Sequence, residues 1–168
     1  KETVESLKPR AAEGQPCQGF EIKTNKGSYT ANRLVIALGT RGNPRTLRCE
    51  GYDLDKVRYH LTDPALHNGE HVMIVGGGNS ALEAAIAIAE IHNGSNHVHL
   101  VYRGDTFKRA SQKNNEELSS LEKAGKITVH RNTNPAGITQ DTVALKPNDG
   151  ESYTVDNHFI YCMLGAEA

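Results

Sequence analysis

The stretch "HVMIVGGGNSALEAA", residues 71–85, decides the fold of this chain. A short apolar run, Val72 to Val75, leads into three consecutive glycines. Leu82, Ile86 and Ala89 then recur at the spacing of an amphipathic helix. A strand, a glycine turn and a helix in this order are the context in which a glycine pattern indicates a dinucleotide-binding unit.

The glycine turn has the pattern G-x-G-x-x-A, formed by Gly76, Gly78 and Ala81. The first glycine permits a tight turn, the second lets the backbone approach a pyrophosphate, and the small third residue lets the helix pack on the strand. The N–H groups at the helix N-terminus would face the phosphates. We therefore expect a set of cofactor-binding residues here, namely Gly76, Gly77, Gly78, Asn79, Ser80 and Ala81. The alternative is a turn built of glycines for steric reasons alone.

The pattern continues beyond the first helix. Residues 97–102 and 127–132 are predicted strands, and residues 114–126 are a predicted helix that ends at Gly125. Strands and helices that alternate in this way predict a Rossmann-like, doubly wound α/β fold with a parallel sheet. The tail, residues 142–164, is predicted to form a small antiparallel meander that returns to the sheet.

The opening of the chain has a different pattern. Residues 20–24 and 28–38 read as two strands around the turn "NKG", and residues 34–38 are apolar enough for a strand buried on both faces. "SYTANRLVIALGT" is weakly repeated by "SYTVDNHFIYCMLGA" near the end, which suggests two related modules. The segment that follows the first of these modules and precedes the strand at Val72 is rich in Gly, Pro, Asn and Asp, as connectors are. We therefore predict the C-terminal remnant of an FAD-domain-like module over 1–45, a connector over 46–70 and an NADP(H)-binding domain over 71–168.

Composition narrows the partners. The chain has 168 residues and a formal net charge of −1, without a basic block that would predict nucleic acid or an anionic membrane as partner. No apolar run reaches the roughly 20 residues of a membrane span, and we expect a cytoplasmic protein with a small-molecule ligand. Cys17, Cys49 and Cys162 form no C-x-x-C motif, so reduced structural thiols are expected. The chain begins at Lys1 rather than Met, which suggests a fragment of a longer protein.

The identity of the dinucleotide depends on the end of the second strand, where an Asp or Glu would bind the ribose 2′-hydroxyl of NAD. Tyr102 stands at that position, and Arg103, Lys108 and Arg109 follow. Basic side chains there can pair with a 2′-phosphate, so NADP(H) is favoured. Asp105 lies in the same loop, so binding of NAD stays an alternative. Lys108 and Arg109 could instead be solvent-exposed residues at the start of the next helix, with no contact to the cofactor.

Four motifs carry a resemblance to a known family, "VGGGNSALEAA", "HLVYRGDTFKRA", "LVIALGT" and "FIYCMLG". Together they resemble the NADPH-binding domain of thioredoxin-reductase-like FAD/NAD(P)-dependent pyridine nucleotide oxidoreductases, flavoproteins with two dinucleotide-binding domains. The resemblance implies that Arg103, with Lys108 or Arg109, binds the 2′-phosphate, although Gly104 replaces an arginine of the family pattern. It also implies that Glu83 lies on the nicotinamide side and that Leu164 and Gly165 form a cofactor-contacting loop.

Two departures from the family pattern matter. Tyr59 and Thr62 stand where thioredoxin reductases have the C-x-x-C redox dithiol, which argues against thioredoxin as the acceptor. The first glycine motif, which would hold FAD, is absent, so the FAD half is largely missing from this sequence. The expected function is delivery of a hydride from NADPH to FAD, bound by the intact protein, for an acceptor such as an iron–sulfur protein, a quinone or a low-molecular-weight disulfide. A non-catalytic NADP-binding or redox-sensing module without flavin is the alternative, and a homodimer is left open.

Histidines give weaker signals. His60 and His67 lie in the connector, where a polar loop histidine is favoured over a proton donor near the flavin. His97 and His99 share a strand face but lack an evident third ligand, so no metal site is predicted. No side chain is assigned an acid or base role, because hydride transfer requires none.

Overall fold

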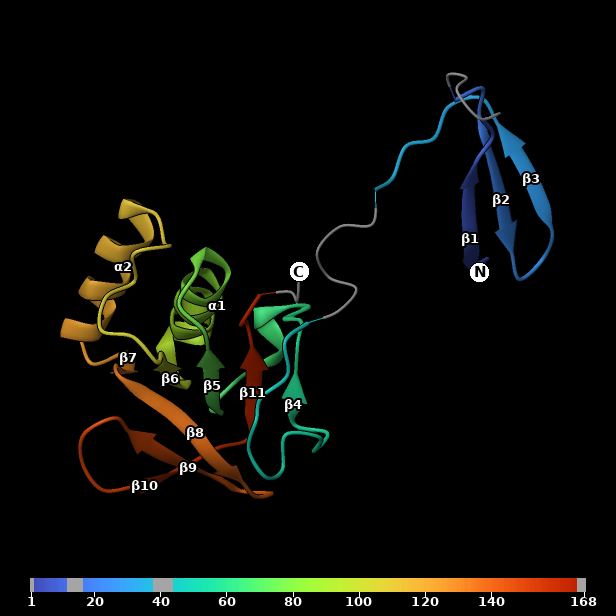
Figure 1. Ribbon diagram of the computed structural model, residues 1–168. Coiled ribbons are helices and arrows are strands. Elements are labelled where there is room, and N and C mark those ends of the chain that lie inside the picture. Colours follow the sequence, from blue (N-terminus) through green and yellow to red (C-terminus); the bar gives the residue numbers. More distant parts are fainter. Residues whose placement is uncertain (1, 12–16, 38–43, 166–168) are drawn as a thin grey trace. The chain divides into compact units, whose positions relative to one another are not determined.

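The computed structural model describes residues 2–11, 17–37 and 44–165. The chain forms two compact units, residues 1–39 and residues 40–168 (Figure 1). Each unit has its own sheet or sheets, so the two are described separately.

The first unit is a three-stranded antiparallel sheet in the order β1-β2-β3, formed by β1 (Val4–Pro9), β2 (Phe20–Thr24) and β3 (Ser28–Ala31). The β2–β3 hairpin was predicted and is confirmed. Its turn is closed by the side chain of Thr24, whose Oγ1 accepts the main-chain N–H groups of Lys26 and Gly27, each at 3.1 Å. The prediction that this module is the remnant of an FAD domain stays a prediction.

The buried strand predicted over residues 34–38 is wrong for the part that is described. Residues 34–37 are not a strand, and the side chains of Val35 and Ile36 are 88% and 65% exposed. Leu38 and Gly39, the predicted end of this strand, lie outside the described residues. An apolar run becomes a buried strand only when strands pair with it, and no strand of the described residues pairs with residues 34–37.

The second unit is built on a five-stranded sheet in the order β4-β11-β5-β6-β7, with every neighbouring pair parallel. Four consecutive residues of the central strand β5 are buried because both faces of the sheet are covered. The Rossmann-like α/β class is confirmed. The strands are β4 (Val57–Arg58), β5 (His71–Val75), β6 (His97–Val101), β7 (Ile127–His130) and β11 (Phe159–Cys162).

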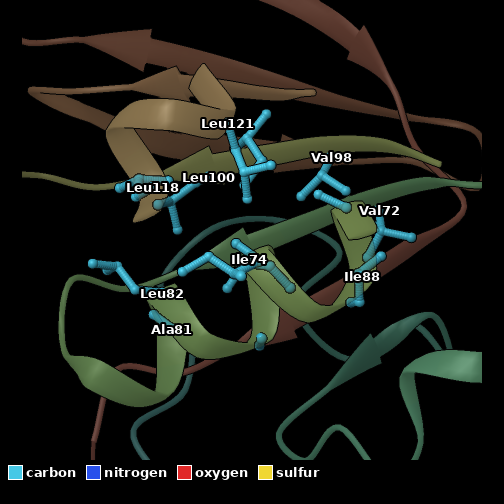
Figure 2. Close-up of a cluster of buried hydrophobic side chains, with 14 of the residues drawn as sticks. Val72, Ile74, Ala81, Leu82, Ile88, Val98, Leu100, Leu118 and Leu121 are labelled. Carbon is cyan, nitrogen blue, oxygen red and sulfur yellow. The ribbon is translucent and has the colours of Figure 1, made fainter. Parts of the chain in front are cut away.

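Two helices, α1 (Asn79–Glu90) and α2 (Gln112–Lys123), cover one face of this sheet (Figure 1). Figure 2 shows the core beneath them, where Leu82 and Ile88 of α1 and Leu118 and Leu121 of α2 pack with side chains of β5 and β6. The short 3-10 helices η1 (Pro64–Leu66) and η2 (Ile91–Gly94) complete the helical elements. No helix among the described residues is both long and apolar enough to cross a bilayer.

An antiparallel meander covers the opposite face of the sheet. It consists of β8 (Thr133–Ile138), β9 (Thr142–Pro147) and β10 (Tyr153–Asp156), in the order β10-β9-β8. Val143 and Leu145 of β9 are fully buried in a second core with side chains of β5 and β11. The predicted meander is therefore present, but its first strand β8 was missed, and the predicted strand at 159–164 is β11, which lies parallel to β5 in the main sheet.

The segment predicted as a connector takes part in this fold. It contributes the edge strand β4 and the buried side chain of Leu47. Lys56 is only 6% exposed, and its Nζ donates to the main-chain carbonyls of Gln140 at 3.1 Å and Asn157 at 3.0 Å. Two hydrogen bonds from one ammonium thus tie this segment to the β8–β9 loop and to the residue that follows β10.

Candidate dinucleotide-binding site

The glycine turn lies at the carboxyl end of β5, between the strand and α1. A Cβ atom on Gly76 would lie 2.5 Å from the carbonyl oxygen of Met163 and 3.0 Å from Cβ of Ala81. Gly76 also has φ +156°, a conformation that side chains disfavour. Ala81 is fully buried, so a larger residue there would push the helix off the strand. The first and third positions of the glycine pattern thus have the packing roles expected for them.

Gly78 differs from Gly76 because it faces open space. Apart from Gly78 and its two chain neighbours, no described residue has an atom within 4 Å of the position that its Cβ would occupy. Gly78 is the N-cap of α1, and its carbonyl accepts the N–H groups of Ala81 and Leu82 at 3.1 and 3.2 Å. The first N–H groups of a helix have no partner within the helix and carry its positive dipole end. The backbone at Gly78 is therefore open to an anionic group, with no side chain in between.

Gly77 is covered by an aromatic ring. A Cβ atom at this residue would lie 2.2 Å from Cε2 of Tyr102, the residue that follows β6. Tyr102 is half-buried and stacks on Phe107, with ring centroids 4.8 Å apart. Tyr102 therefore lies beside the glycine turn. Its predicted contact with the cofactor stays a prediction.

The basic loop, defined as residues 103–109, reaches the glycine turn. A parallel β-bridge joins Gly78 to Arg109. Arg103, Lys108 and Arg109 are exposed, and none forms an ion pair with another residue that the structure describes. The structure thus places three uncompensated cationic residues in the loop that borders the candidate pyrophosphate site.

A hydrogen-bond network joins the starts of α1 and α2. Oδ1 of Asn79 accepts the main-chain N–H of Ser111 at 2.7 Å and Nδ2 of Asn114 at 3.1 Å. Nδ2 of Asn114 also lies 3.1 Å from Oε1 of Glu83. Asn114 is only 7% exposed and was not singled out in the sequence, because nothing local distinguishes a buried asparagine in a polar helix. Ser80 is exposed and lies at the same helix start.

The predicted loop at Leu164 and Gly165 follows β11, next to the glycine turn. The main-chain N–H of Met163, the residue before this loop, donates to the carbonyl of Val75 at 2.8 Å. Leu164 packs against the second core, and Gly165 has φ +85° with its carbonyl accepting the N–H of Arg45 at 3.0 Å. The loop is therefore at the same carboxyl edge of the sheet as the glycine turn, where ligands of open α/β sheets bind.

The positions of the family's dithiol have no thiol chemistry. Tyr59 packs against the second core, and burial raises the pKa of its phenol. Thr62 is exposed. Two cysteines of the second unit, Cys49 and Cys162, are partly or fully buried, and their thiols are poor nucleophiles. Burial raises the pKa of Cys49 and raises that of Cys162 to about 12.

Of the histidines that the sequence singled out, only His60 comes near this edge, because it lies two residues after β4 in the parallel sheet. His67 lies in a loop, as predicted, but it is buried, with 2% of its surface exposed. Its Nε2 lies 2.8 Å from the hydroxyl of Tyr161. Burial lowers the pKa of His67. Its ring packs edge-on against Phe159, the first residue of β11, at the end of the sheet away from the glycine turn. His60 is exposed, and His97 and His99 belong to β6, where Nδ1 of His99 faces Nε2 of His130 at 3.0 Å.

Comparison with known proteins identifies the family of this chain. A family model described as pyridine nucleotide-disulphide oxidoreductase matches residues 2–168. Bacilliredoxin reductase Bdr of Bacillus subtilis is 27% identical over 147 residues, which are 87% of this chain and 44% of that protein. Ferredoxin–NADP reductase of Rickettsia canadensis is 31% identical over 141 residues, 81% of this chain and 39% of that protein.

Solved structures give the same result for the fold. Bacillithiol disulfide reductase Bdr (YpdA) from Staphylococcus aureus is 33% identical with a TM-score of 0.82, covering 98% of this chain and 48% of that one. Thioredoxin reductase of Lactococcus lactis is 22% identical with a TM-score of 0.78, covering 96% of this chain and 52% of that one. The chain spans about half or less of the length of these relatives. It has the thioredoxin-reductase-like flavoprotein fold, and it belongs to the pyridine nucleotide-disulphide oxidoreductase family.

Proposed function

We propose that this chain binds NADPH as the pyridine-nucleotide-binding part of an FAD-dependent oxidoreductase whose electron acceptor is not thioredoxin. The observation that carries the proposal is the open backbone at Gly78, bridged to the basic loop, whose Arg103, Lys108 and Arg109 form no ion pair with any described residue. A glycine needed for steric reasons alone would have neighbours that a Cβ would strike, as Gly76 has. The space at Gly78 is instead what the approach of a pyrophosphate requires.

Each part of the site has a proposed role. The glycine turn and the first turn of α1, Gly76 to Ala81, hold the pyrophosphate. Arg103, with Lys108 and Arg109, binds the 2′-phosphate through charge-assisted hydrogen bonds. Glu83 and the loop of Leu164 and Gly165 lie on the nicotinamide side.

The bound nicotinamide supplies a hydride for transfer to a flavin. The residues of this chain contribute binding and orientation, and no side chain needs to move a proton in that step. The first unit, as far as it is described, is an antiparallel sheet without a strand, glycine turn and helix. We therefore assign the FAD pyrophosphate site to sequence outside the described residues.

The proposed acceptor follows from the thiol chemistry and from the relatives. Tyr59 and Thr62 cannot form a redox disulfide, and Cys162 has a pKa of about 12, so a protein dithiol within the second unit is disfavoured. Relatives of this chain are named for ferredoxin, bacilliredoxin and bacillithiol disulfide. We propose an iron–sulfur protein or a low-molecular-weight disulfide as the class of acceptor.

The test is a calorimetric titration of the chain with NADPH and with NADH, before and after Arg103→Ala. Arg103→Ala should weaken NADPH binding at least about tenfold, or about 1.4 kcal/mol, and leave NADH binding nearly unchanged. Arg48→Ala is the matched control, because Arg48 is also exposed but lies outside the basic loop. Equal losses for both nucleotides would show that Arg103 does not read the 2′-phosphate.

A further inference from the structure

The ring of Tyr102 lies between the backbones of two glycines. Its Cε2 edge faces Gly77, where a Cβ would lie 2.2 Å away, and its Cε1 edge faces Gly104, where a Cβ would lie 2.8 Å away. Real Cβ atoms are not found this close to a ring carbon, so both positions require glycine while the ring stays in place. Gly104 has no strained φ angle, so the ring of Tyr102 is what excludes a side chain there.

The ring has little room to move away. It stacks on Phe107 with an interplanar angle of 24°, and Phe107 is 6% exposed in the core under the helices. The guanidinium carbon of Arg131 lies 5.8 Å from the Phe107 ring centroid, and Arg131 is itself held by a bidentate contact with Glu122 at 2.6 and 2.7 Å. A displaced Tyr102 ring would therefore press on Gly77 or disturb this stack.

The two glycines belong to the two halves of the proposed cofactor site. Gly77 is in the turn assigned to the pyrophosphate, and Gly104 directly follows Arg103 in the basic loop. The main chain on either side of the ring is fixed as well, because Thr133 N–H donates to Tyr102 O at 3.1 Å and Asn132 N–H donates to Gly104 O at 3.0 Å. The ring is thus a spacer of fixed width between the turn and the loop.

We propose that Tyr102 is a positioning residue that sets the spacing between the glycine turn and Arg103, and thereby sets the preference of the site for NADPH over NADH. The inference rests on the proposed function, since it concerns the same site. The few rotatable bonds between the pyrophosphate and the 2′-phosphate limit the distance between them, so the 2′-phosphate meets Arg103 at least cost when turn and loop are already held at a matching distance. NADH lacks the 2′-phosphate and is indifferent to that spacing.

The proposal also accounts for Gly104, which replaces an arginine of the family pattern. An arginine at 104 would place its Cβ against the tyrosine ring. Tyr102 and Gly104 are therefore sterically coupled, and the position of Arg103 depends on the spacing that they maintain.

The test is a double-mutant cycle on the full chain, with the ratio of the NADH to the NADPH dissociation constant as readout. Gly104→Ala should lower this ratio about fivefold, and Tyr102→Leu should do the same, but Gly104→Ala should change it less than about twofold in the Tyr102→Leu background. Tyr102→Phe should keep the wild-type ratio, because ring carbons are the nearest atoms at both glycines, and the hydroxyl, 3.0 Å from the Cβ position of Gly104, is farther than Cε1 and Cζ. A general loss of structure would weaken both nucleotides and leave the ratio unchanged.

Three results would overturn the proposal. They are an unchanged ratio of dissociation constants in Gly104→Ala, additive effects of Gly104→Ala and Tyr102→Leu on this ratio, or a lowered ratio in Tyr102→Phe. Gly104→Ala and Tyr102→Phe decide the matter even if Tyr102→Leu does not fold, with circular dichroism as the check on folding. Titration of the wild type with both nucleotides distinguishes failure of the proposed function from failure of the role proposed for Tyr102. A wild type without preference for NADPH contradicts the proposed function itself, whereas a preference that survives Gly104→Ala contradicts only the role of Tyr102.

Discussion

The side-chain oxygen of Asn79 accepts the main-chain N–H of Ser111 at 2.7 Å, which joins the first residue of α1 to the N-cap of α2. Ser111 lies two residues after Arg109, so this hydrogen bond fixes the end of the basic loop against the helix that follows the glycine turn. Together with the bridge between Gly78 and Arg109, it makes the turn and the loop one structural unit.

Asn79→Ala should destabilise the second unit by about 1 kcal/mol, because the N–H of Ser111 and the amide of Asn114 lose an acceptor. Asn79→Asp is the informative partner variant, since a carboxylate keeps the acceptor and suits a helix N-terminus. It should keep the thermal midpoint yet weaken NADPH binding by charge repulsion with the phosphates. Thermal unfolding and nucleotide titration of both variants would show this split, and a stable Asn79→Ala would contradict it.

The stability of the chain should depend on pH through the pair of His99 and His130. Their facing ring nitrogens lie 3.0 Å apart, so one must donate and the other must accept, which requires at least one neutral ring. Burial, followed by the charges of His130, His71 and His97, lowers the pKa of His99 from 6.5 to about 4, while Asp156 opposes the shift. Burial also lowers the pKa of His130.

The sign of this dependence follows from linkage. Between pH 6.5 and about 4 the unfolded chain binds a proton at His99 that the native state does not, so the free energy of unfolding should fall as the pH falls through this range and level off below it. The full loss for His99 would be roughly 3 kcal/mol. Urea unfolding at several pH values measures it, with His99→Gln as the variant that should show a weaker slope. An equal slope in His99→Gln would assign the dependence to other groups.

Lys56→Met should destabilise the chain by about 1 to 3 kcal/mol, because the buried carbonyl of Asn157 and the partly buried carbonyl of Gln140 would lose their donor. Burial lowers the pKa of Lys56, and Asp141 opposes that shift, so the ammonium is retained by its hydrogen bonds at a desolvation cost. Lys146→Met is a matched control, since Lys146 also donates to a carbonyl, that of Gly150 at 3.1 Å, but is exposed. Urea unfolding should show a larger loss of unfolding free energy for Lys56→Met than for Lys146→Met. Equal losses would contradict the claim that burial makes the hydrogen bonds of Lys56 important for stability.

The part of the fold nearest the glycine turn was predictable because its signals are local. The apolar run of β5, the glycines and the apolar spacing of α1 lie within consecutive residues, and each has a direct steric reason in the structure. The helix predicted over 114–126 is α2, shifted to Gln112–Lys123, because Ser111 caps it three residues before the predicted start.

Features that depend on distant partners were not predictable in the same way. Residues 34–37 and β11 occupy equivalent places in the weak sequence repeat, each following a three-stranded antiparallel sheet. β11 is buried because β4 and β5 pair with it, whereas residues 34–37 have no such partners among the described residues. The strand β8 contains Pro135 and Gly137, which weaken any strand signal, and it forms because β9 pairs with it.

The candidate site shows the same limit. The glycine turn and the basic loop could be found from spacing after each strand. The contacts of Tyr102 with Gly77 and of Asn79 with Asn114 join residues that are 25 and 35 positions apart, and no periodicity encodes them.

The most direct test of the account is to measure NADPH binding by Gly78→Ala beside Gly137→Ala. Outside its own chain neighbours, neither glycine has a described protein atom within 4 Å of its Cβ position, and neither has a positive φ, so both variants should fold. Gly78→Ala should lower the thermal midpoint slightly, because alanine is a poorer N-cap of α1 than glycine. A methyl group at Gly78 blocks the approach of the pyrophosphate, so Gly78→Ala should reduce NADPH affinity by about tenfold or more while Gly137→Ala leaves it unchanged. Equal NADPH affinity in the wild type and in a folded Gly78→Ala variant would contradict the assignment of the glycine turn as the pyrophosphate site.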